Sequence, residues 1–168
     1  ENNHVILSDE KARSLLIEKY PIDDFVQKKF KDLYFSDDEN LLIDIIRSNI
    51  PKLDNEYEQA IARSALIRAC MKKRPRGIFT YTGHRYDDGR KDLVLTLEEQ
   101  FLNAVEAINQ SIFDNHQSNI SYRKNALDVE LPDNCLIYID PPYYSTCSDN
   151  EYVRRYHFVE GLSLDWKE

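Results

Sequence analysis

Glycine is scarce in this chain, and its placement excludes one familiar kind of ligand loop. Four glycines occur in 168 residues, and each stands alone, at Gly77, Gly83, Gly89 and Gly161. Glycine allows a backbone to approach a ligand closely because it has no Cβ. The sequence therefore contains no Gly-rich loop of the kind that wraps a nucleotide or a similar cofactor.

Cysteines and long apolar runs are also few. Cys70, Cys135 and Cys147 are odd in number and far apart, which favours reduced thiols in a cytoplasmic protein over a disulfide framework or a metal site. No stretch approaches the roughly 20 apolar residues of a membrane span, and residues 1–4, which begin with the acidic Glu1, do not resemble a signal peptide. We expect a soluble globular chain that needs neither a metal nor a membrane.

Basic residues are outnumbered, with 22 Lys and Arg against 30 Asp and Glu and a net charge of −8. This balance argues against nonspecific coating of nucleic acid, although a local basic face is still compatible with DNA binding. The densest basic stretch, 72–91, has tyrosines between its charges, which predicts a DNA-facing loop. A solvated helix end with cations near the helix C-terminus is the alternative. The expected contacts are Lys72, Lys73, Arg74, Arg76, Arg85 and Arg90.

Two capping boxes, in which a side chain at each end of a four-residue unit satisfies a backbone donor, predict helices in the middle of the chain. They are Ser36 with Glu39 and Thr96 with Glu99. The apolar pattern after the first box ends before Pro51, and the pattern after the second continues to Ile108. Two more helices are expected, one capped by Asp54 and one over 152–166.

Short apolar runs predict strands near both ends of the chain, at 5–7, 120–122 and 136–139. Strands on either side of a helical middle indicate an α/β sheet interrupted by an inserted, largely helical lobe. We assign that lobe to residues 21–115 and its DNA-recognition loop to residues 72–93.

The most informative run is Leu136-Ile137-Tyr138-Ile139-Asp140-Pro141-Pro142-Tyr143. Proline has no N–H and fixes φ, so a strand must stop at Asp140. The carboxylate then lies at the carboxyl end of a strand, where open α/β sheets place ligand crevices. Two fixed acceptors, the Asp140 carboxylate and the Pro141 carbonyl, beside the ring of Tyr143 suit a planar substrate with an exocyclic amino group. A rigid surface turn is the plainer alternative.

This Asp-Pro-Pro-Tyr run resembles the catalytic motif of amino-group DNA methyltransferases, and the surrounding sequence looks most like their adenine-specific, Dam-like branch. The resemblance implies methylation of adenine N6 in double-stranded DNA, as in restriction–modification, with S-adenosyl-L-methionine as cofactor and the target base flipped out. It also implies a Rossmann-like methyltransferase sheet, of which residues 1–168 would form a partial domain. Cytosine N4 stays open as the target, since the same acceptors fit either amino group.

The resemblance assigns the catalytic roles to Asp140, Pro141, Pro142 and Tyr143. Hydrogen bonds from the substrate N–H groups to the Asp140 carboxylate and the Pro141 carbonyl would aim the nitrogen lone pair at the methyl group. Positioning then supplies much of the acceleration, without a metal or a covalent intermediate. Stacking of Tyr143 on the flipped base is worth ~1–3 kcal/mol.

Asp9 and Asn125 match cofactor-binding positions of the family. An acid after a strand binds ribose hydroxyls in such folds, and Asp9 follows the first predicted strand. Helix capping by Asp9 is an equal alternative, unless Ser8 takes that role. Asn125 stands where the family often has an acid that accepts from the cofactor's adenine, and Asp128 is offset from that place. This departure leaves the adenine contact open.

Arg154 and Arg155 follow the catalytic run, and the resemblance makes them phosphate contacts near the flipped nucleotide. Ion pairing with the many acids is the alternative. The family's Phe-x-Gly-x-Gly-type loop is absent from the sequence. We therefore expect an internal fragment, a truncated product or a degenerate relative that is catalytically silent by itself. The rival function classes are a noncatalytic DNA- or partner-binding remnant and a metal-dependent nucleotide-processing enzyme, for which clustered carboxylates with histidine are lacking.

Overall fold

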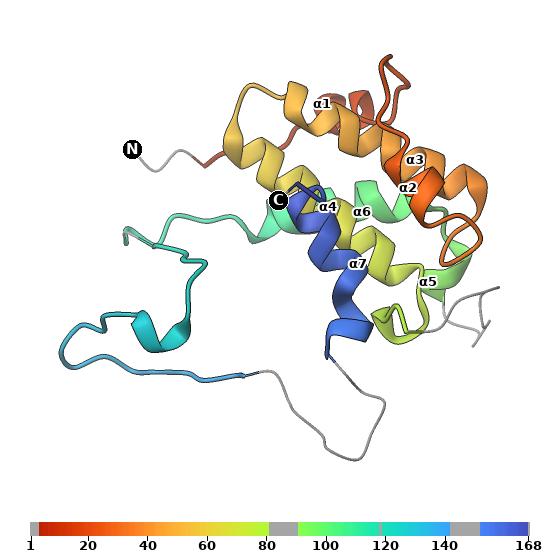
Figure 1. Ribbon diagram of the computed structural model, residues 1–168. Coiled ribbons are helices and arrows are strands. Elements are labelled where there is room, and N and C mark those ends of the chain that lie inside the picture. Colours follow the sequence, from red (N-terminus) through yellow and green to blue (C-terminus); the bar gives the residue numbers. More distant parts are fainter. Residues whose placement is uncertain (1–3, 81–90, 118, 142–151, 168) are drawn as a thin grey trace.

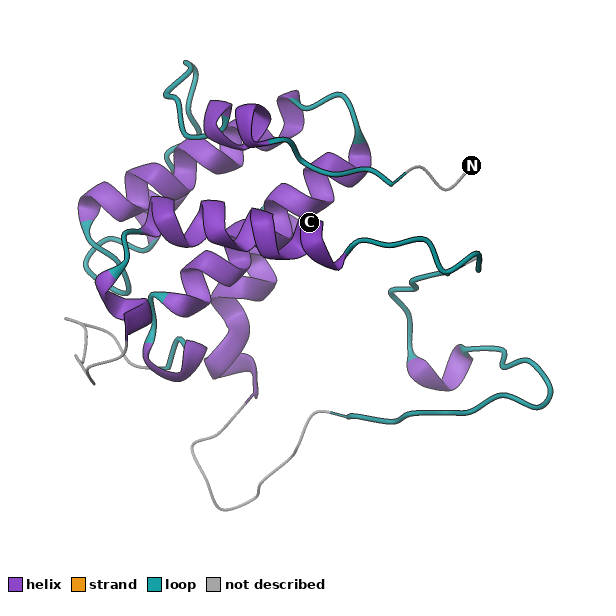
Figure 2. Ribbon diagram, turned by 180° about the vertical axis from the view of Figure 1, so that it is seen from behind, coloured by secondary structure: helices purple, strands orange, loops and turns teal. Residues whose placement is uncertain are grey.

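The computed structural model describes residues 4–80, 91–117, 119–141 and 152–167, and all regular secondary structure in these ranges is helical. The described residues between 5 and 112 form a bundle with residues 152–167, whereas residues 113–141 leave it as an extended arm (Figure 1, Figure 2). The α-helices are α1 (Asp9–Ser14), α2 (Phe25–Lys29), α3 (Asp37–Asn49), α4 (Glu56–Lys72), α5 (Lys91–Val94), α6 (Leu97–Ser111) and α7 (Tyr152–Leu164). Short 3-10 turns are η1 (Ile50–Lys52), η2 (Pro75–Gly77) and η3 (Ala126–Asp128).

Helix α4 lies at the centre of the bundle, where it packs extensively against α6 and also contacts α3 and α7 (Figure 1). Its buried residues include the small Ala62, Ala65 and Ala69 beside the larger Ile61 and Leu66. Small side chains allow neighbouring helices to approach closely while their larger residues interdigitate. Phe101 of α6 is fully buried, whereas Tyr57 in the first turn of α4 is exposed.

The predicted helix starts are confirmed, except that the cap of one helix lies one residue later than predicted. Both capping boxes are formed, by Ser36 with Glu39 at α3 and by Thr96 with Glu99 at α6. The cap of α4 is Asn55, whose Oδ1 accepts from the N–H groups of the first turn at 2.8 and 3.4 Å. The prediction of Asp54 was therefore wrong by one residue, because an asparagine amide oxygen caps as well as a carboxylate.

Helix α7 confirms the helix expected over 152–166, and it returns the chain to the bundle after the arm (Figure 2). Phe158 is fully buried, with its ring 4.8 Å from that of Phe79 and 4.9 Å from that of Phe30. A Cβ on Gly161 would lie 2.0 Å from the indole Nε1 of Trp166. Glycine at this position therefore permits Trp166 to fold back onto the helix.

The predicted α/β fold is wrong for the described residues. Residues 5–7, 120–122 and 136–139 are not assigned to strands in the described ranges, and no sheet is present there. The buried Leu7 has its backbone N–H and C=O bonded to the side-chain amide of Asn109 at 3.1 and 2.8 Å instead. A strand forms only where a neighbour completes its backbone hydrogen bonds. A helical bundle with an extended arm thus replaces the partial Rossmann-like sheet, and the helical lobe expected at 21–115 lies in a bundle that also includes α1 and α7.

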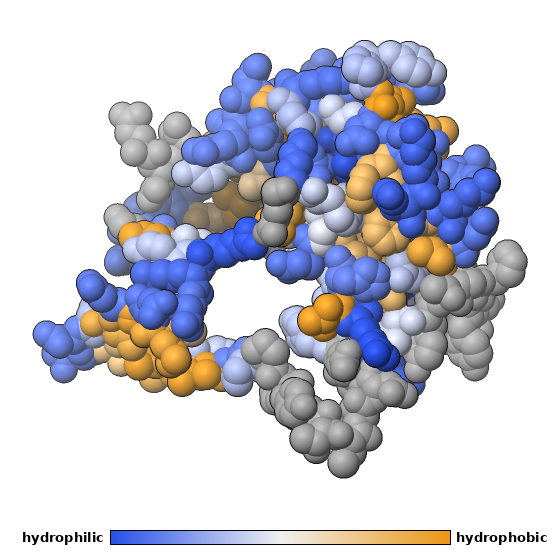
Figure 3. Space-filling model, viewed as in Figure 1, coloured by the Kyte–Doolittle hydropathy of each residue, from blue (hydrophilic) through white to orange (hydrophobic). Residues whose placement is uncertain are grey.

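Apolar side chains gather along the arm and face solvent (Figure 3). Leu136 is 99% exposed and Ile139 is 76% exposed, so the run that precedes Asp140 is not the buried strand that its pattern predicted. None of the described helices is both long and apolar enough to span a lipid bilayer.

Candidate functional site

Asp140 and Pro141 lie at the end of the described arm, and both residues are exposed. Within the described ranges, the Asp140 carboxylate takes part in no hydrogen bond or ion pair. Pro142 and Tyr143 lie outside the described residues. The structure therefore leaves the Asp140 carboxylate accessible to a ligand. The segment that carries it extends away from the bundle (Figure 1).

Asp9 lies in the first turn of α1, where Ser8 and not Asp9 caps the helix. The Ser8 hydroxyl oxygen accepts from the N–H of Lys11 at 3.3 Å. The Asp9 carboxylate is 73% exposed and binds Arg13 through Oδ2 at 2.8 Å, a hydrogen bond that raises the pKa of Arg13. Ser8 therefore caps α1, and the alternative role of Asp9 as the cap does not apply. Oδ1 of Asp9 has no partner within the described chain.

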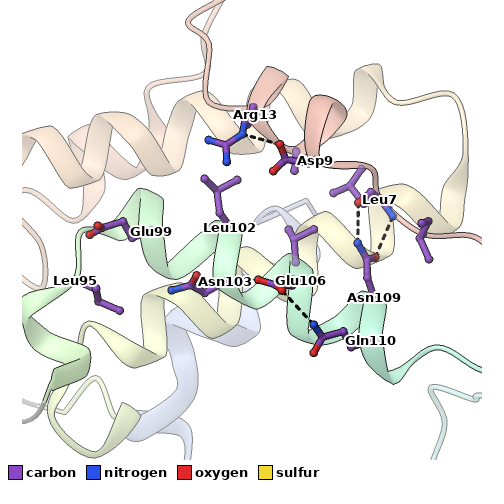
Figure 4. Close-up of a pocket in the computed structure, with 13 residues that line it drawn as sticks. Leu7, Asp9, Arg13, Leu95, Glu99, Leu102, Asn103, Glu106, Asn109 and Gln110 are labelled. Carbon is purple, nitrogen blue, oxygen red and sulfur yellow. Dashed lines mark hydrogen bonds and ion pairs between the residues drawn. The ribbon is translucent and has the colours of Figure 1, made fainter.

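A cavity of about 600 Å³ lies between α1 and α6, and Asp9 is on its rim (Figure 4). This volume is within the roughly 300–1,000 Å³ of typical small-molecule sites. Leu102 and Val105 supply apolar wall, and Glu106 lies beside them, hydrogen-bonded to Gln110 at 3.1 Å. The cavity combines an apolar surface with a few polar groups, as ligand sites do.

Asn109 shapes this cavity, although no sequence pattern singled it out. Its amide makes two hydrogen bonds to the backbone of Leu7 and so holds the segment before α1 against α6 (Figure 4). Asn109 and Leu7 are 102 residues apart in the sequence, so no local sequence pattern marks their contact. The pair Asp9 and Arg13, in contrast, has the i, i+4 spacing that is recognisable in the sequence.

Asn125 lies on the arm and does not line the cavity that contains Asp9. Its side-chain oxygen accepts from the N–H of Leu127 at 3.1 Å and caps the short turn η3. Nor is Asp140 among the lining residues. The structure therefore does not unite the predicted cofactor and catalytic residues in one cavity.

The basic segment divides into buried and exposed residues. Lys73 and Arg74 are 2% and 4% exposed, so neither side chain is accessible to a DNA phosphate in this structure. Lys73 Nζ lies 2.5 Å from the carbonyl oxygen of Leu95 and 3.3 Å from the Glu39 carboxylate. Arg74 donates to the carbonyl oxygen of Tyr34 at 2.8 Å, and its guanidinium lies 5.2 Å from the Tyr34 ring centre. These two cations stabilise the bundle, and their role as DNA contacts stays a prediction that this structure does not support.

Lys72, the last residue of α4, and Arg76, in η2, are both exposed. The backbone N–H of Phe79 donates to the carbonyl oxygen of Arg155 at 2.9 Å, which places the segment after Arg76 beside the start of α7. The two groups of basic residues that the sequence separates by about 80 positions are thus brought together, with Arg154 exposed. Arg85 and Arg90 lie outside the described residues.

The burial of Arg74 leads to a stability prediction. Arg74→Ala is expected to lower the free energy of unfolding by about 2 kcal/mol, because it removes a charge-assisted hydrogen bond and a cation–π contact from the interior. Arg76→Ala, a control two residues away at an exposed position, is expected to change it by less than about 0.5 kcal/mol. Urea unfolding followed by circular dichroism measures both, and equal effects would contradict the assignment.

Comparison with known proteins shows the family to which this chain belongs. The family described as D12 class N6 adenine-specific DNA methyltransferase matches residues 3–165, and the chain therefore belongs to this family. The chain is also 30% identical over 157 residues to the Type II methyltransferase M2.HphI of Haemophilus parahaemolyticus. The match covers 84% of this chain and 46% of that protein, so the chain spans about half the length of this curated relative. No solved structure matches the chain significantly.

Three or more His, Cys, Asp and Glu side chains do not converge anywhere in the described ranges in a way that could hold a metal ion. The buried thiol of Cys70 has its pKa raised by burial, which makes it a poor nucleophile at neutral pH.

Proposed function

We propose that this chain carries the catalytic motif and part of the DNA-binding surface of an S-adenosylmethionine-dependent adenine N6 DNA methyltransferase. The observation that carries the proposal is the family match over residues 3–165, which includes the Asp-Pro-Pro-Tyr run at 140–143. The accessible, unpaired carboxylate of Asp140 supports it, because an acceptor that must bind a substrate amino group cannot be occupied by the protein. A role in restriction–modification and a cytoplasmic location remain predictions.

The role of Asp140 follows from the chemistry of the substrate amino group. The lone pair of an adenine amino nitrogen is delocalised into the ring, so the nitrogen is a poor nucleophile. Hydrogen bonds from N6–H to the Asp140 carboxylate and the Pro141 carbonyl favour a pyramidal nitrogen whose lone pair points at the methyl donor. Adenine N6 is paired inside a duplex, so the base must be flipped out, and stacking on Tyr143 offsets part of the unstacking.

The cavity between α1 and α6 fits part of the cofactor. S-adenosyl-L-methionine, when bound, supplies the methyl group as an electrophilic sulfonium. Oδ1 of Asp9 is available to accept from a ribose hydroxyl at the rim, and Leu102 and Val105 offer an apolar wall to a base. None of the described residues that line the cavity is a glycine, so this part of its wall does not allow the close backbone approach that the amino-acid end of the cofactor would need. Asp9 is the residue that we expect to hold the ribose, and Asn125 stays a second, separate proposal.

For DNA, we propose that Lys72, Arg76, Arg154 and Arg155 contact phosphates, with Arg85 and Arg90 as further contacts from outside the described residues. The proximity of η2 and the start of α7 supports a continuous basic surface from two segments. Such contacts position a duplex without reading its sequence. They are compatible with the net charge of −8 because only the local charge has to be positive.

A hybrid protein tests the proposed function. In it, this chain replaces the matched segment of the Type II methyltransferase M2.HphI, so that the remainder of a curated relative accompanies the Asp140 motif. We expect the hybrid to form N6-methyladenine in unmethylated DNA, measured by mass spectrometry of the digested nucleosides. The 168-residue chain measured alone is expected to be silent, since it lacks a Gly-rich cofactor loop.

The outcomes separate the competing functions. N4-methylcytosine in place of N6-methyladenine would make cytosine N4 the target of this chain. A hybrid that is folded and binds DNA, yet methylates neither base while the unaltered relative is active, would contradict the proposal. That result would favour the noncatalytic DNA-binding alternative.

A further inference from the structure

A second, smaller hollow lies between α4 and α6, with a volume of about 180 Å³. Arg68 and Lys72 line it from α4, and Asn103, Ala104 and Ala107 line it from α6. The two helices pack side by side here (Figure 1). Among the described residues that line the hollow, Arg68 and Lys72 are basic and none is acidic, in a chain whose net charge is −8.

Arg68 is exposed and makes no hydrogen bond, ion pair or aromatic contact with the described chain. Other arginines of the bundle have such partners: Arg13 binds Asp9, Arg47 binds Asp44 and Arg74 binds the Tyr34 carbonyl. Eight more acids than bases make partners plentiful for a cation in this protein. The Arg68 guanidinium has no partner in the described chain, and no described acid lines its hollow, so it can bind an anion from outside the protein.

The shape of the hollow limits what that anion can be. Its volume is below the roughly 300 Å³ at which small-molecule sites begin, so it holds one group of a larger ligand. Ala104 and Ala107 present only methyl groups and permit close approach to the helix surface. The Asn103 side chain has no hydrogen bond in the described chain and adds a neutral donor beside Arg68. A tetrahedral oxyanion matches a guanidinium fork with an amide donor next to it.

We infer that this hollow binds one backbone phosphate of duplex DNA, with Arg68 as its principal contact. Lys72 lines the hollow and also begins the basic segment 72–91, so the phosphate site extends the DNA surface along α4 by one helical turn. The inference rests on the proposed function for its choice of DNA as the polyanion. It adds a contact that lies outside the basic segment and that no motif marks.

Salt dependence of DNA binding tests the inference. Affinity of the 168-residue chain for a fluorescent duplex is measured by anisotropy at several salt concentrations, without cofactor. One phosphate contact contributes about 0.9 to the slope of log K against log salt concentration. Arg68→Gln is expected to reduce that slope by about 0.9, and Arg68→Lys, which keeps the charge, is expected to retain it. Asn103→Ala is expected to weaken binding without changing the slope.

Two control variants make the outcomes distinguishable. Arg13→Gln removes the same charge from an arginine already paired with Asp9 and is expected to leave the slope unchanged. Arg76→Gln tests the basic segment itself. An unchanged slope in Arg68→Gln together with a reduced slope in Arg76→Gln would overturn this inference and leave the proposed function standing. Unchanged slopes in both variants would overturn this inference together with the proposed DNA contact of Arg76, whereas the hybrid protein tests the proposed methyl transfer separately. Equal slope losses in Arg13→Gln and Arg68→Gln would contradict the specificity of the site.

Discussion

Asp140→Ala is expected to lower methyl transfer by the hybrid enzyme by on the order of 10²–10³-fold, the cost of removing one well-placed polar group from an active site. Alanine cannot accept a hydrogen bond from the substrate amino group, so the lone pair of the nitrogen is no longer aimed at the methyl group. Because the carboxylate is exposed and unpaired in the described chain, its removal should leave folding unchanged. Single-turnover rates with saturating DNA and cofactor measure the effect.

Asp133 provides a matched control for this prediction. It is an exposed aspartate on the same arm, seven residues before Asp140, and Asp133→Ala removes the same charge. We expect the Asp133 variant to keep the parental rate. Asp140→Asn, which retains one acceptor oxygen but loses the charge, is expected to fall between the parent and Asp140→Ala. Activity of Asp140→Ala within about tenfold of the parent would show that this carboxylate is not the acceptor.

Arg47→Met is expected to reduce the free energy of unfolding by about 3–5 kcal/mol, the largest stability effect that we predict. The Arg47 side chain is 3% exposed and contacts carboxylates from three parts of the chain: Asp44 at 2.6 Å, Asp165 at 2.9 Å and Asp23 at 3.2 Å. Its guanidinium also lies 5.2 Å from the Trp166 ring centre. Removing it leaves the fully buried Asp44 without its cation, and that desolvated charge is the main cost.

Arg47 connects helices that are far apart in the sequence. Asp44 accepts from the N–H groups of Val26 and Gln27 at 3.0 and 2.9 Å, so it caps α2 from α3. Asp165 follows α7 directly, so the same guanidinium ties the C-terminal segment to the bundle. Arg13→Met, which breaks an exposed pair, is expected to cost less than about 1 kcal/mol. Equal losses of stability in the two variants, measured by urea unfolding, would contradict a special role for Arg47.

The same network predicts a direction for the dependence of stability on pH. Burial opposes the charged form of Asp165, but hydrogen bonds and charges from Lys167 and Arg47 outweigh it and hold the pKa of Asp165 below its ordinary value. A lowered pKa in the folded state stabilises the fold above the unfolded value of about 3.9, and that contribution is lost as the pH falls through the folded pKa. In the Arg47→Met variant, this acid sensitivity should be reduced.

Helix starts were predictable from the sequence because capping is local. The side chain that satisfies a free N–H lies within three residues of it, so the pairs Ser36 with Glu39 and Thr96 with Glu99 could be recognised without knowledge of the fold. The cap of α4 was missed by one position because Asp54 and Asn55 are adjacent and both side chains can cap. The segment that the resemblance identified, 140–143, is likewise a contiguous run.

The predicted strands failed for the opposite reason. An apolar, β-branched run such as 136–139 indicates that a segment can pair and be buried, but pairing needs a neighbouring strand that the run itself does not contain. Within the described chain these residues are extended and exposed. The same limitation applied to residues 5–7, whose backbone is satisfied by the side chain of Asn109 on α6.

The sequence by itself determined where the helices begin and which family the chain resembles, because both depend on residues close together in the chain. The tertiary structure alone decided which basic residues face solvent. Lys73 and Arg74 lie between Lys72 and Arg76 in the sequence, yet Glu39, Leu95 and Tyr34 from other elements bury the inner pair. It also left Arg68 unpaired beside α6. Burial and pairing depend on what packs against a side chain, and those neighbours come from distant parts of the chain.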